Sequence, residues 1–147
     1  INELKSLKVK IKLITDGDIA GALLVTKPDY NVDIYLGIGG GPEGVLAAAA
    51  LDAFDCHFQG RFIFENEKDI YEAKKMGIEN LDRKYELREI IKGDSIFCAT
   101  AITDTLNLKG IKNENNSTYL SETLITHKNL KEKKVVKKRI FFDKIKD

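Results

Sequence analysis

The first part of the chain alternates apolar and charged positions and then changes to a helix-like run. Val9, Ile11 and Leu13 are separated by single lysines, a spacing that predicts a half-exposed strand. Residues 15–18, Thr-Asp-Gly-Asp, end this strand, and the apolar residues 19–26 favour a helix. The start of the chain is therefore predicted to be a strand, an acidic loop and a helix.

A second unit of the same kind follows after a short turn. Residues 34–38 carry isoleucine or leucine at every other position, which predicts a compact buried strand. Three glycines at residues 39–41 come next, and because glycine lacks a Cβ the backbone can bend sharply there. The proline and alanine-rich run of residues 42–51 then favours a helix. Two such units in tandem give a βαβα pattern, which predicts a parallel sheet.

The rest of the chain mixes β-favouring runs with charged, helix-like segments. Residues 58–64 and 95–101 are predicted strands, and residues 65–76 and 81–92 are predicted helices. Alternation near the end predicts two last strands in an antiparallel pair, residues 119–126 and 135–142. The predicted fold is therefore α/β, with a mixed, largely parallel sheet, helices on both faces and a terminal antiparallel strand pair. Its length predicts a single domain over residues 1–147.

Composition and charge exclude the more unusual classes of protein. The chain is 43% hydrophobic and 32% charged, with 24 basic and 23 acidic residues, so it has no overall bias toward nucleic acid. No apolar run approaches the length needed to span a membrane, and no signal peptide is visible, which favours the cytoplasm. The last twenty residues carry nine lysines or arginines against three acids. We interpret them as a solvated edge hairpin whose lysines discourage edge pairing, rather than as a nucleic-acid or membrane patch.

Three acidic residues stand where the two predicted strands end. Asp16 and Asp18 follow the first strand, and Glu43 follows the second one, just inside the predicted helix. Ligands of open α/β sheets bind at these strand ends, and the free N–H groups of a helix start favour phosphate. The three carboxylates could hold a divalent cation, or the aspartates could accept hydrogen bonds from sugar hydroxyls. Either aspartate could instead simply cap the following helix.

The glycine loop also fits a dinucleotide-binding fingerprint. Gly39, Gly41 and Gly44 are spaced as G-x-G-x-x-G, and Glu65 stands about where a ribose-binding acid would lie. This alternative predicts binding of NAD(P) without a metal ion. However, an acid inside the loop, Glu43, is unfavourable for a pyrophosphate unless a metal ion lies between them. A tight strand-to-helix turn without a ligand is the simplest alternative.

Other candidate residues are interpreted as structural. Thr103 and Asp104 are read as a strand-end turn, and His57 and His127 have no ligand-like neighbours in the sequence. The sequence contains no P-loop motif, no H-E-x-x-H and no G-x-S-x-G, so the corresponding enzyme classes are not indicated.

Several segments together resemble one enzyme family. The Asp-Gly-Asp segment at residues 13–22 and the Gly-Ile-Gly-Gly-Gly-Pro-Glu-Gly block within residues 32–50 resemble class II fructose-1,6-bisphosphatases, which are lithium-sensitive, metal-dependent sugar phosphatases. Residues 59–61, 99–104 and 122–124 are similar to later segments of that family. The resemblance covers about residues 9–127 and is to the C-terminal half of these enzymes.

This resemblance implies an activity and a set of site residues. The family hydrolyses the 1-phosphate of fructose 1,6-bisphosphate with Mn²⁺ or Mg²⁺, in gluconeogenesis. By resemblance, Asp16, Gly17 and Asp18 contact the sugar phosphate, Gly40 offers its backbone to the substrate, and Glu43 is a metal ligand. The expected partner is therefore a small sugar bisphosphate, with neither nucleic acid nor membrane, and the protein is expected to be a homo-oligomer.

Two departures from the family pattern limit what this chain is expected to do. The other metal-binding acids, a substrate tyrosine and a Lys-x-Arg clamp of the family all precede the Asp-Gly-Asp segment, but only fifteen residues precede Asp16. We therefore expect the N-terminal metal-binding domain to be absent, no catalytic residue within residues 1–147, an exposed apolar flank and little or no activity of the chain alone. A non-catalytic sugar-phosphate-binding domain is the other alternative. In addition, Ala101 and Thr105 replace glycines that the family usually has around Thr103 and Asp104.

Overall fold

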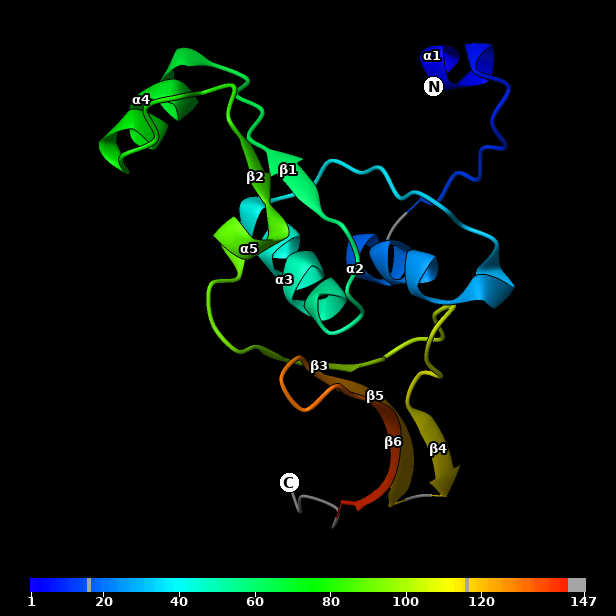
Figure 1. The fold of residues 1–147 in the computed structure, drawn as a ribbon. Helices are drawn as coiled ribbons and strands as arrows, with labels where there is room; N and C mark the ends of the chain where they lie inside the picture. Colours follow the sequence, from blue (N-terminus) through cyan, green and yellow to red (C-terminus); the bar gives the residue numbers. More distant parts are fainter. Residues whose placement is uncertain (16, 116, 143–147) are drawn as a thin grey trace.

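The computed structural model describes residues 1–15, 17–115 and 117–142. Its N-terminal part is helical and contains α1, α2, the 3₁₀ helices η1 and η2, and α3 (Figure 1). Their bounds are Asn2–Ser6, Asp18–Ala22, Leu23–Thr26, Pro28–Tyr30 and Gly41–Asp52.

Helices α2 and α3 form the centre of the helical part. Alanines on α3 are buried, and their small side chains allow α2 and η1 to approach closely. Two clusters of buried residues result: Ala22, Ala47, Leu51 and Leu87 in one, and Leu23, Ala50 and Phe97 in the other. The helices predicted at residues 19–26 and 42–51 are thus confirmed.

A smaller unit follows α3 and lies beside it (Figure 1). It consists of β1, α4, β2 and α5, with bounds Gln59–Arg61, Glu67–Lys75, Lys84–Glu86 and Leu87–Ile90. The side chain of Asn66 accepts a hydrogen bond from the N–H of Asp69 at 3.0 Å and so begins α4. Gly77, in the left-handed region with φ of 86°, ends it. The helix predicted at residues 65–76 is confirmed, and the strand predicted at residues 58–64 is shortened to β1.

The helix predicted over residues 81–92 is largely wrong. Residues 84–86 instead pair antiparallel with β1, with Gly60 opposite Tyr85. Helical structure begins only at Leu87, where the carboxylate of Glu89 accepts a hydrogen bond from the N–H of Glu86 at 2.9 Å. Pairing with β1 therefore overrides the local helical preference of this segment.

The C-terminal part is a sheet organised around one long strand. The strands are β3, β4, β5 and β6, with bounds Ile96–Thr100, Lys112–Asn115, Thr118–His127 and Glu132–Phe141. β6 pairs with β5 over its whole length, whereas β3 and β4 pair with successive parts of the opposite edge of β5. The predicted strand at residues 95–101 and the predicted terminal antiparallel pair are thus confirmed.

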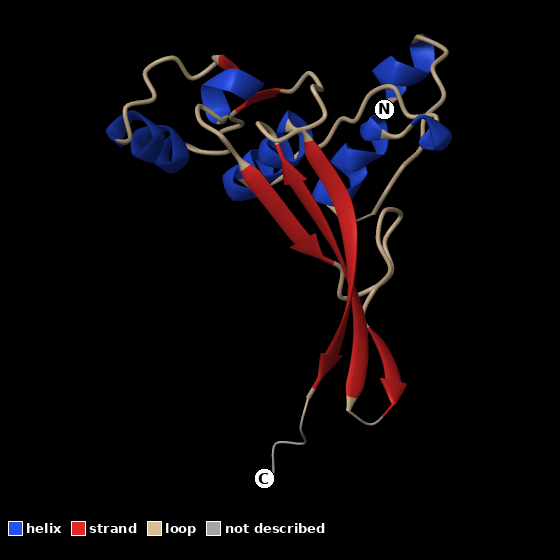
Figure 2. Cartoon of the chain, turned by 60° about the horizontal axis from the view of Figure 1, so that its bottom comes forward, coloured by secondary structure: helices blue, strands red, loops and turns tan. Residues whose placement is uncertain are grey.

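The parallel part of the predicted sheet is not confirmed. Residues 9–14 and 33–38 form no strand, and every strand pair recorded among the described residues is antiparallel. The helices lie together at one end of the sheet rather than on both of its faces (Figure 2). A parallel strand pairs with a neighbouring strand that is reached through a long crossover connection. Among the described residues, no strand pairs with residues 9–14 or 33–38. The α/β class itself is confirmed.

Among the residues that the structure describes, no helix combines the length and the apolar character needed to cross a membrane.

Candidate functional site

The start of α2 and the loop that enters α3 meet at one place. A methyl group on Gly39 would lie only 2.7 Å from Oδ2 of Asp18, so the Asp18 carboxylate rests against the glycine backbone. A methyl group on Gly40 would overlap the Glu43 carboxylate, which folds back over the start of the helix. The glycines at 39 and 40 thus make room for two carboxylates, and both Asp18 and Glu43 are exposed to solvent.

Local sequence explains how each carboxylate reaches this place. Gly17 adopts a left-handed conformation, with φ of 85°, and this turn makes Asp18 the first residue of α2. Gly40 is the extended N-cap of α3, and its carbonyl accepts the N–H of Gly44 at 3.0 Å. No side chain caps the start of α3, so backbone N–H groups of its first turn stay available to an anion.

Tyr35 belongs to the same site and was not identified from the sequence. It is the one residue of 33–38 that is not exposed, and its ring packs against the first buried cluster. Burial raises the pKa of the Tyr35 hydroxyl, and the negative charge of the nearby Asp18 carboxylate raises this pKa further. The alternation of residues 34, 36 and 38 could have indicated Tyr35, because it puts this side chain on the opposite side.

The residues predicted to bind substrate and metal have different outcomes. Asp16 lies outside the described residues. Gly17, Asp18, Gly40 and Glu43 are described, and the structure brings the last three together around the glycine loop. Their contacts with a substrate or a metal ion stay predictions.

The described residues do not form a metal centre on their own. In residues 1–15, 17–115 and 117–142 there is no group of three or more His, Cys, Asp or Glu side chains that could hold an ion. Hard divalent cations take about six oxygen ligands, and Glu43 with Asp18 supplies too few. These two carboxylates supply only some of the ligands that such an ion needs.

The dinucleotide alternative lacks its structural frame in the described residues. Residues 33–38 form no strand, and β1, which precedes Glu65, pairs antiparallel with β2. Glu65 is exposed, and its N–H donates to the Asp69 carboxylate at 3.2 Å just before α4. The parallel βαβ unit that places a ribose-binding acid beside a glycine loop is not seen.

Two further acids hold the loop between β3 and β4. Oδ1 of Asp104 accepts the N–H of Gly110 at 2.8 Å, which keeps the pKa of Asp104 below its usual value. Glu122 on β5 accepts the N–H of Lys109 at 2.8 Å and lies 2.9 Å from the Lys137 ammonium. These contacts confirm the strand-end turn at residues 103–104. His127 also has a structural contact, because its Nε2 lies 2.6 Å from Oδ2 of Asp94.

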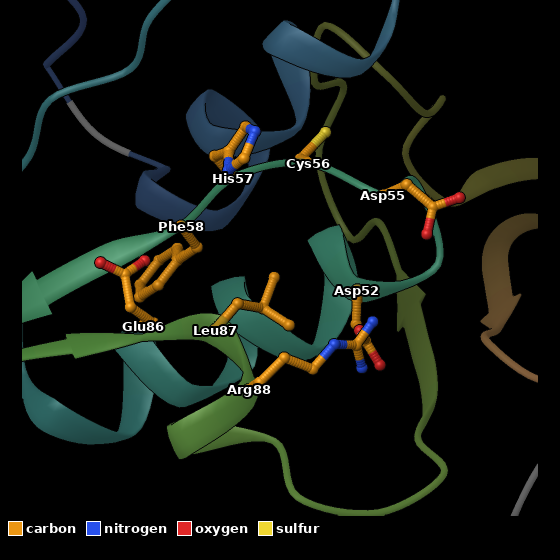
Figure 3. A pocket seen from close by; sticks show the side chains of 8 residues that line it. All are labelled: Asp52, Asp55, Cys56, His57, Phe58, Glu86, Leu87 and Arg88. Carbon is orange, nitrogen blue, oxygen red and sulfur yellow. The ribbon is translucent and has the colours of Figure 1, made fainter.

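A pocket of about 250 Å³ lies at the opposite end of α3 (Figure 3). Asp52, the last residue of α3, is fully buried there, with its Oδ1 2.8 Å from the guanidinium of Arg88. At the rim, Lys128 forms an ion pair with Asp55. Since these charged groups pair with one another, we interpret this pocket as part of the packing between the end of α3, residues 55–58 and the start of α5, separate from the glycine loop.

Comparisons with known proteins agree with the resemblance seen in the sequence. The family model described as bacterial fructose-1,6-bisphosphatase, glpX-encoded, matches residues 1–140. The fructose-1,6-bisphosphatase class 2 of Haemophilus influenzae is 37% identical over 141 residues, which cover 87% of this chain and 42% of that protein.

Two further relatives are named D-fructose 1,6-bisphosphatase class 2/sedoheptulose 1,7-bisphosphatase. The one from Thermosynechococcus vestitus is 33% identical over 126 residues, 76% of this chain and 36% of the relative. The one from Prochlorococcus marinus strain MIT 9515 is 33% identical over 140 residues, 86% of this chain and 42% of the relative. The chain thus spans roughly two fifths of the length of the curated relatives it matches.

Proposed function

The chain belongs to the bacterial fructose-1,6-bisphosphatase family, and from that premise we propose that it is the C-terminal, substrate-side domain of a metal-dependent phosphatase. The proposed reaction of the whole enzyme hydrolyses the 1-phosphate of fructose 1,6-bisphosphate to fructose 6-phosphate and phosphate, as a step of gluconeogenesis. The observation that supports this best is the meeting of Asp18 with the glycine loop that opens α3.

The electrostatics of the site suggest which part of the substrate each group contacts. The start of α3 offers free N–H groups and the positive end of a twelve-residue helix, which favour a phosphate. An ionised Asp18 repels a phosphate but accepts hydrogen bonds from hydroxyl groups, so we assign it to the sugar. Asp16 and Gly17 are proposed to contribute to the same sugar-phosphate contact, and Gly40 is proposed to offer its backbone to the substrate.

Class 2 fructose bisphosphatases are metal-dependent. We propose Mn²⁺ or Mg²⁺ as the ion and Glu43 as one of its ligands. Such an ion screens phosphate charge and activates a water when it is bound. Because Glu43 has too few acidic neighbours among the described residues, we propose that this chain by itself binds sugar phosphate without hydrolysing it.

Exposed apolar side chains support the proposal that this domain works with another part of the enzyme. Ile34, Leu36 and Ile38 are 74%, 69% and 81% exposed, although their pattern is that of a buried strand. Relatives have more than half of their length outside the matched segment. We propose that this outside portion supplies strands to residues 33–38, and that a second copy of the chain covers further apolar surface in a homo-oligomer.

Calorimetric titration of the 147-residue chain with fructose 6-phosphate, with Mg²⁺ present, tests this function. We expect saturable binding that Asp18→Asn weakens about tenfold, since a hydrogen bond to a charged group is lost. Asp29→Asn, which changes an exposed acid in η2, is the matched control and leaves the affinity unchanged. Tight binding of NAD(P) without metal, unaffected by Asp18→Asn, would replace the proposal with the dinucleotide alternative.

A further inference from the structure

We propose that two copies of this chain associate through the outer face of α4, formed by Glu67, Tyr71 and Lys75, with the two helices antiparallel across a two-fold axis. The inference names a surface for the homo-oligomer of the proposed function and rests on the proposed function in that respect alone. It does not involve the glycine loop, so association and binding of sugar phosphate can succeed or fail separately.

Helix α4 lies at the end of an arm made by residues 59–86 (Figure 1, Figure 2). The arm consists of the short β1–β2 ribbon and α4, which makes only sparse contacts with the other described helices and strands. Isolated helices shorter than about 12–15 residues are marginally stable in water, and α4 has nine. A two-stranded ribbon is also marginal on its own. A further layer of protein over α4 would therefore stabilise the arm.

Aromatic side chains hold the base of this arm. The centre of the Phe62 ring lies 6.0 Å from that of Phe64 and 5.8 Å from that of Tyr85 in β2. The guanidinium of Arg83 lies 4.9 Å from the centre of the Tyr85 ring and forms an ion pair with Glu89 of α5. These contacts stiffen the ribbon that carries α4, which reduces the entropy that association would cost.

One side of α4 is buried within the arm, and another side is exposed. Ala73 is buried and Ile70 is half-buried, three residues apart on the inner side. Glu67, Tyr71 and Lys75 are spaced by four residues and form a row along the outer face, where all three are exposed. Within residues 1–15, 17–115 and 117–142, neither Glu67 nor Lys75 forms an ion pair with another side chain.

The outer face of α4 is complementary to itself. Tyr71, which is 65% exposed, stands at its centre, with Glu67 one turn before it and Lys75 one turn after it. When a second helix lies antiparallel with its own Tyr71 at the same place, each Glu67 faces Lys75 of the other copy. Eight residues of helix span about 12 Å, so one ion pair forms at each end of the contact. A parallel arrangement would bring like charges together and is disfavoured.

The charge order of the whole helix favours a second copy over a different partner. Acids stand in the first turn of α4, Glu67 and Asp69, and lysines stand in the last turn, Lys74 and Lys75. In a two-fold arrangement the same surface is used by both copies, so each acidic end meets a basic end. The surface thus carries its own complement. An exposed tyrosine at its centre is typical of residues that contribute most to association.

Charge reversal in the 147-residue chain tests this arrangement. Glu67→Lys brings lysines together at both ends of the contact, and Lys75→Glu brings acids together. In sedimentation velocity over a range of concentrations, we expect a dimer with a dissociation constant on the order of micromolar, because the surface is small. Each variant should raise this constant about tenfold. Asp29→Lys, which reverses an exposed acid in η2, is the matched control and should leave it unchanged.

Combining the two variants identifies the ion pairs. A mixture of Glu67→Lys chains and Lys75→Glu chains should form the dimer that each forms poorly alone, because position 67 of one chain then faces an opposite charge at position 75 of the other. A chain that carries both substitutions should also dimerise. Damage to the helix cannot explain these restored dimers, since they contain the same substitutions as the weakened ones.

The outcomes separate this inference from the rest of the proposed function. A dimer that neither variant weakens, or a weakened dimer that the mixture does not restore, would overturn the inference and leave a homo-oligomer formed through another surface. A chain that stays monomeric at every concentration would overturn the inference and the homo-oligomer together. Calorimetry with fructose 6-phosphate should give the same affinity for Glu67→Lys as for the unchanged chain. Failure of both to bind would contradict the proposed sugar-phosphate site and not the association.

Discussion

The β5–β6 hairpin and residues 33–38 have similarly β-favouring sequences, but only the hairpin forms strands. β5 finds its partner immediately after a tight turn, in which the N–H of Lys131 donates to the carbonyl of Lys128 at 3.0 Å. Residues 33–38 lead instead into a glycine loop and a helix, so a parallel neighbour has to come from another part of the structure. The comparison shows that an antiparallel pair is specified locally, whereas a parallel strand depends on a partner supplied from elsewhere.

The largest expected effect is a loss of stability in the C-terminal sheet, whose strands are paired within this chain. Phe97 on β3 is buried in the second cluster, between α3 and the sheet. Phe97→Ala should lower the free energy of unfolding by about 3–5 kcal/mol, because it removes a large buried side chain and leaves a cavity. Urea unfolding followed by circular dichroism measures this, and a loss below about 1 kcal/mol would mean that the sheet and α3 are not packed as described.

A second substitution tests the glycine loop, where a change should affect ligand binding rather than stability. Gly39→Ala should displace the Asp18 carboxylate and weaken fructose 6-phosphate binding about tenfold, with little change in unfolding. Calorimetric titration of the variant measures the loss.

Gly44→Ala is the matched control for Gly39→Ala. A Cβ there has open space, and alanine stabilises a helix interior by about 0.5–1 kcal/mol relative to glycine. Equal loss of affinity in the two variants would contradict the described geometry, since both glycines belong to the dinucleotide fingerprint and only Gly39 touches Asp18.

The stability of the sheet should also depend on pH in the acid range. The N–H of Lys109 and the ammonium of Lys137 lower the pKa of Glu122, so its ionised form is favoured in the folded chain. Its contribution to stability is full above its ordinary pKa of 4.5 and is lost as the pH falls through the lower folded value. Urea unfolding at several pH values should show that Glu122→Gln reduces this acid dependence, and an unchanged profile would contradict the role of Glu122.

The smallest effect is expected within residues 33–38. Leu36 is 69% exposed, so Leu36→Ser should change the free energy of unfolding of this chain by no more than about 0.5 kcal/mol. The same measurement as for Phe97→Ala applies. A loss comparable to that of Phe97→Ala would mean that residues 33–38 are buried in the chain as it stands.

The elements that the sequence predicted well are those whose signals are local. The Asn66 cap and Gly77 delimit α4, and the alanine-rich run after Pro42 becomes α3. The failures at residues 9–14, 33–38 and 81–92 all depend on which other strand is within reach, a property that periodicity does not contain. At the candidate site, the motifs indicated Asp18 and Glu43, and the structure brings both side chains to the glycine loop. The place of Tyr35 was not predicted, because it depends on how residues 33–38 pack against α2 and α3.

The central proposal to be tested is that this chain binds a sugar bisphosphate at the glycine loop without hydrolysing it by itself. A ³¹P NMR spectrum of fructose 1,6-bisphosphate with the purified 147-residue chain and Mg²⁺ tests both parts at once. We expect the 1-phosphate resonance to shift or broaden when the chain is added, and we expect Asp18→Asn to reduce this change. No inorganic phosphate should appear. A growing inorganic phosphate signal, or a spectrum that the chain leaves unchanged, would contradict this proposal.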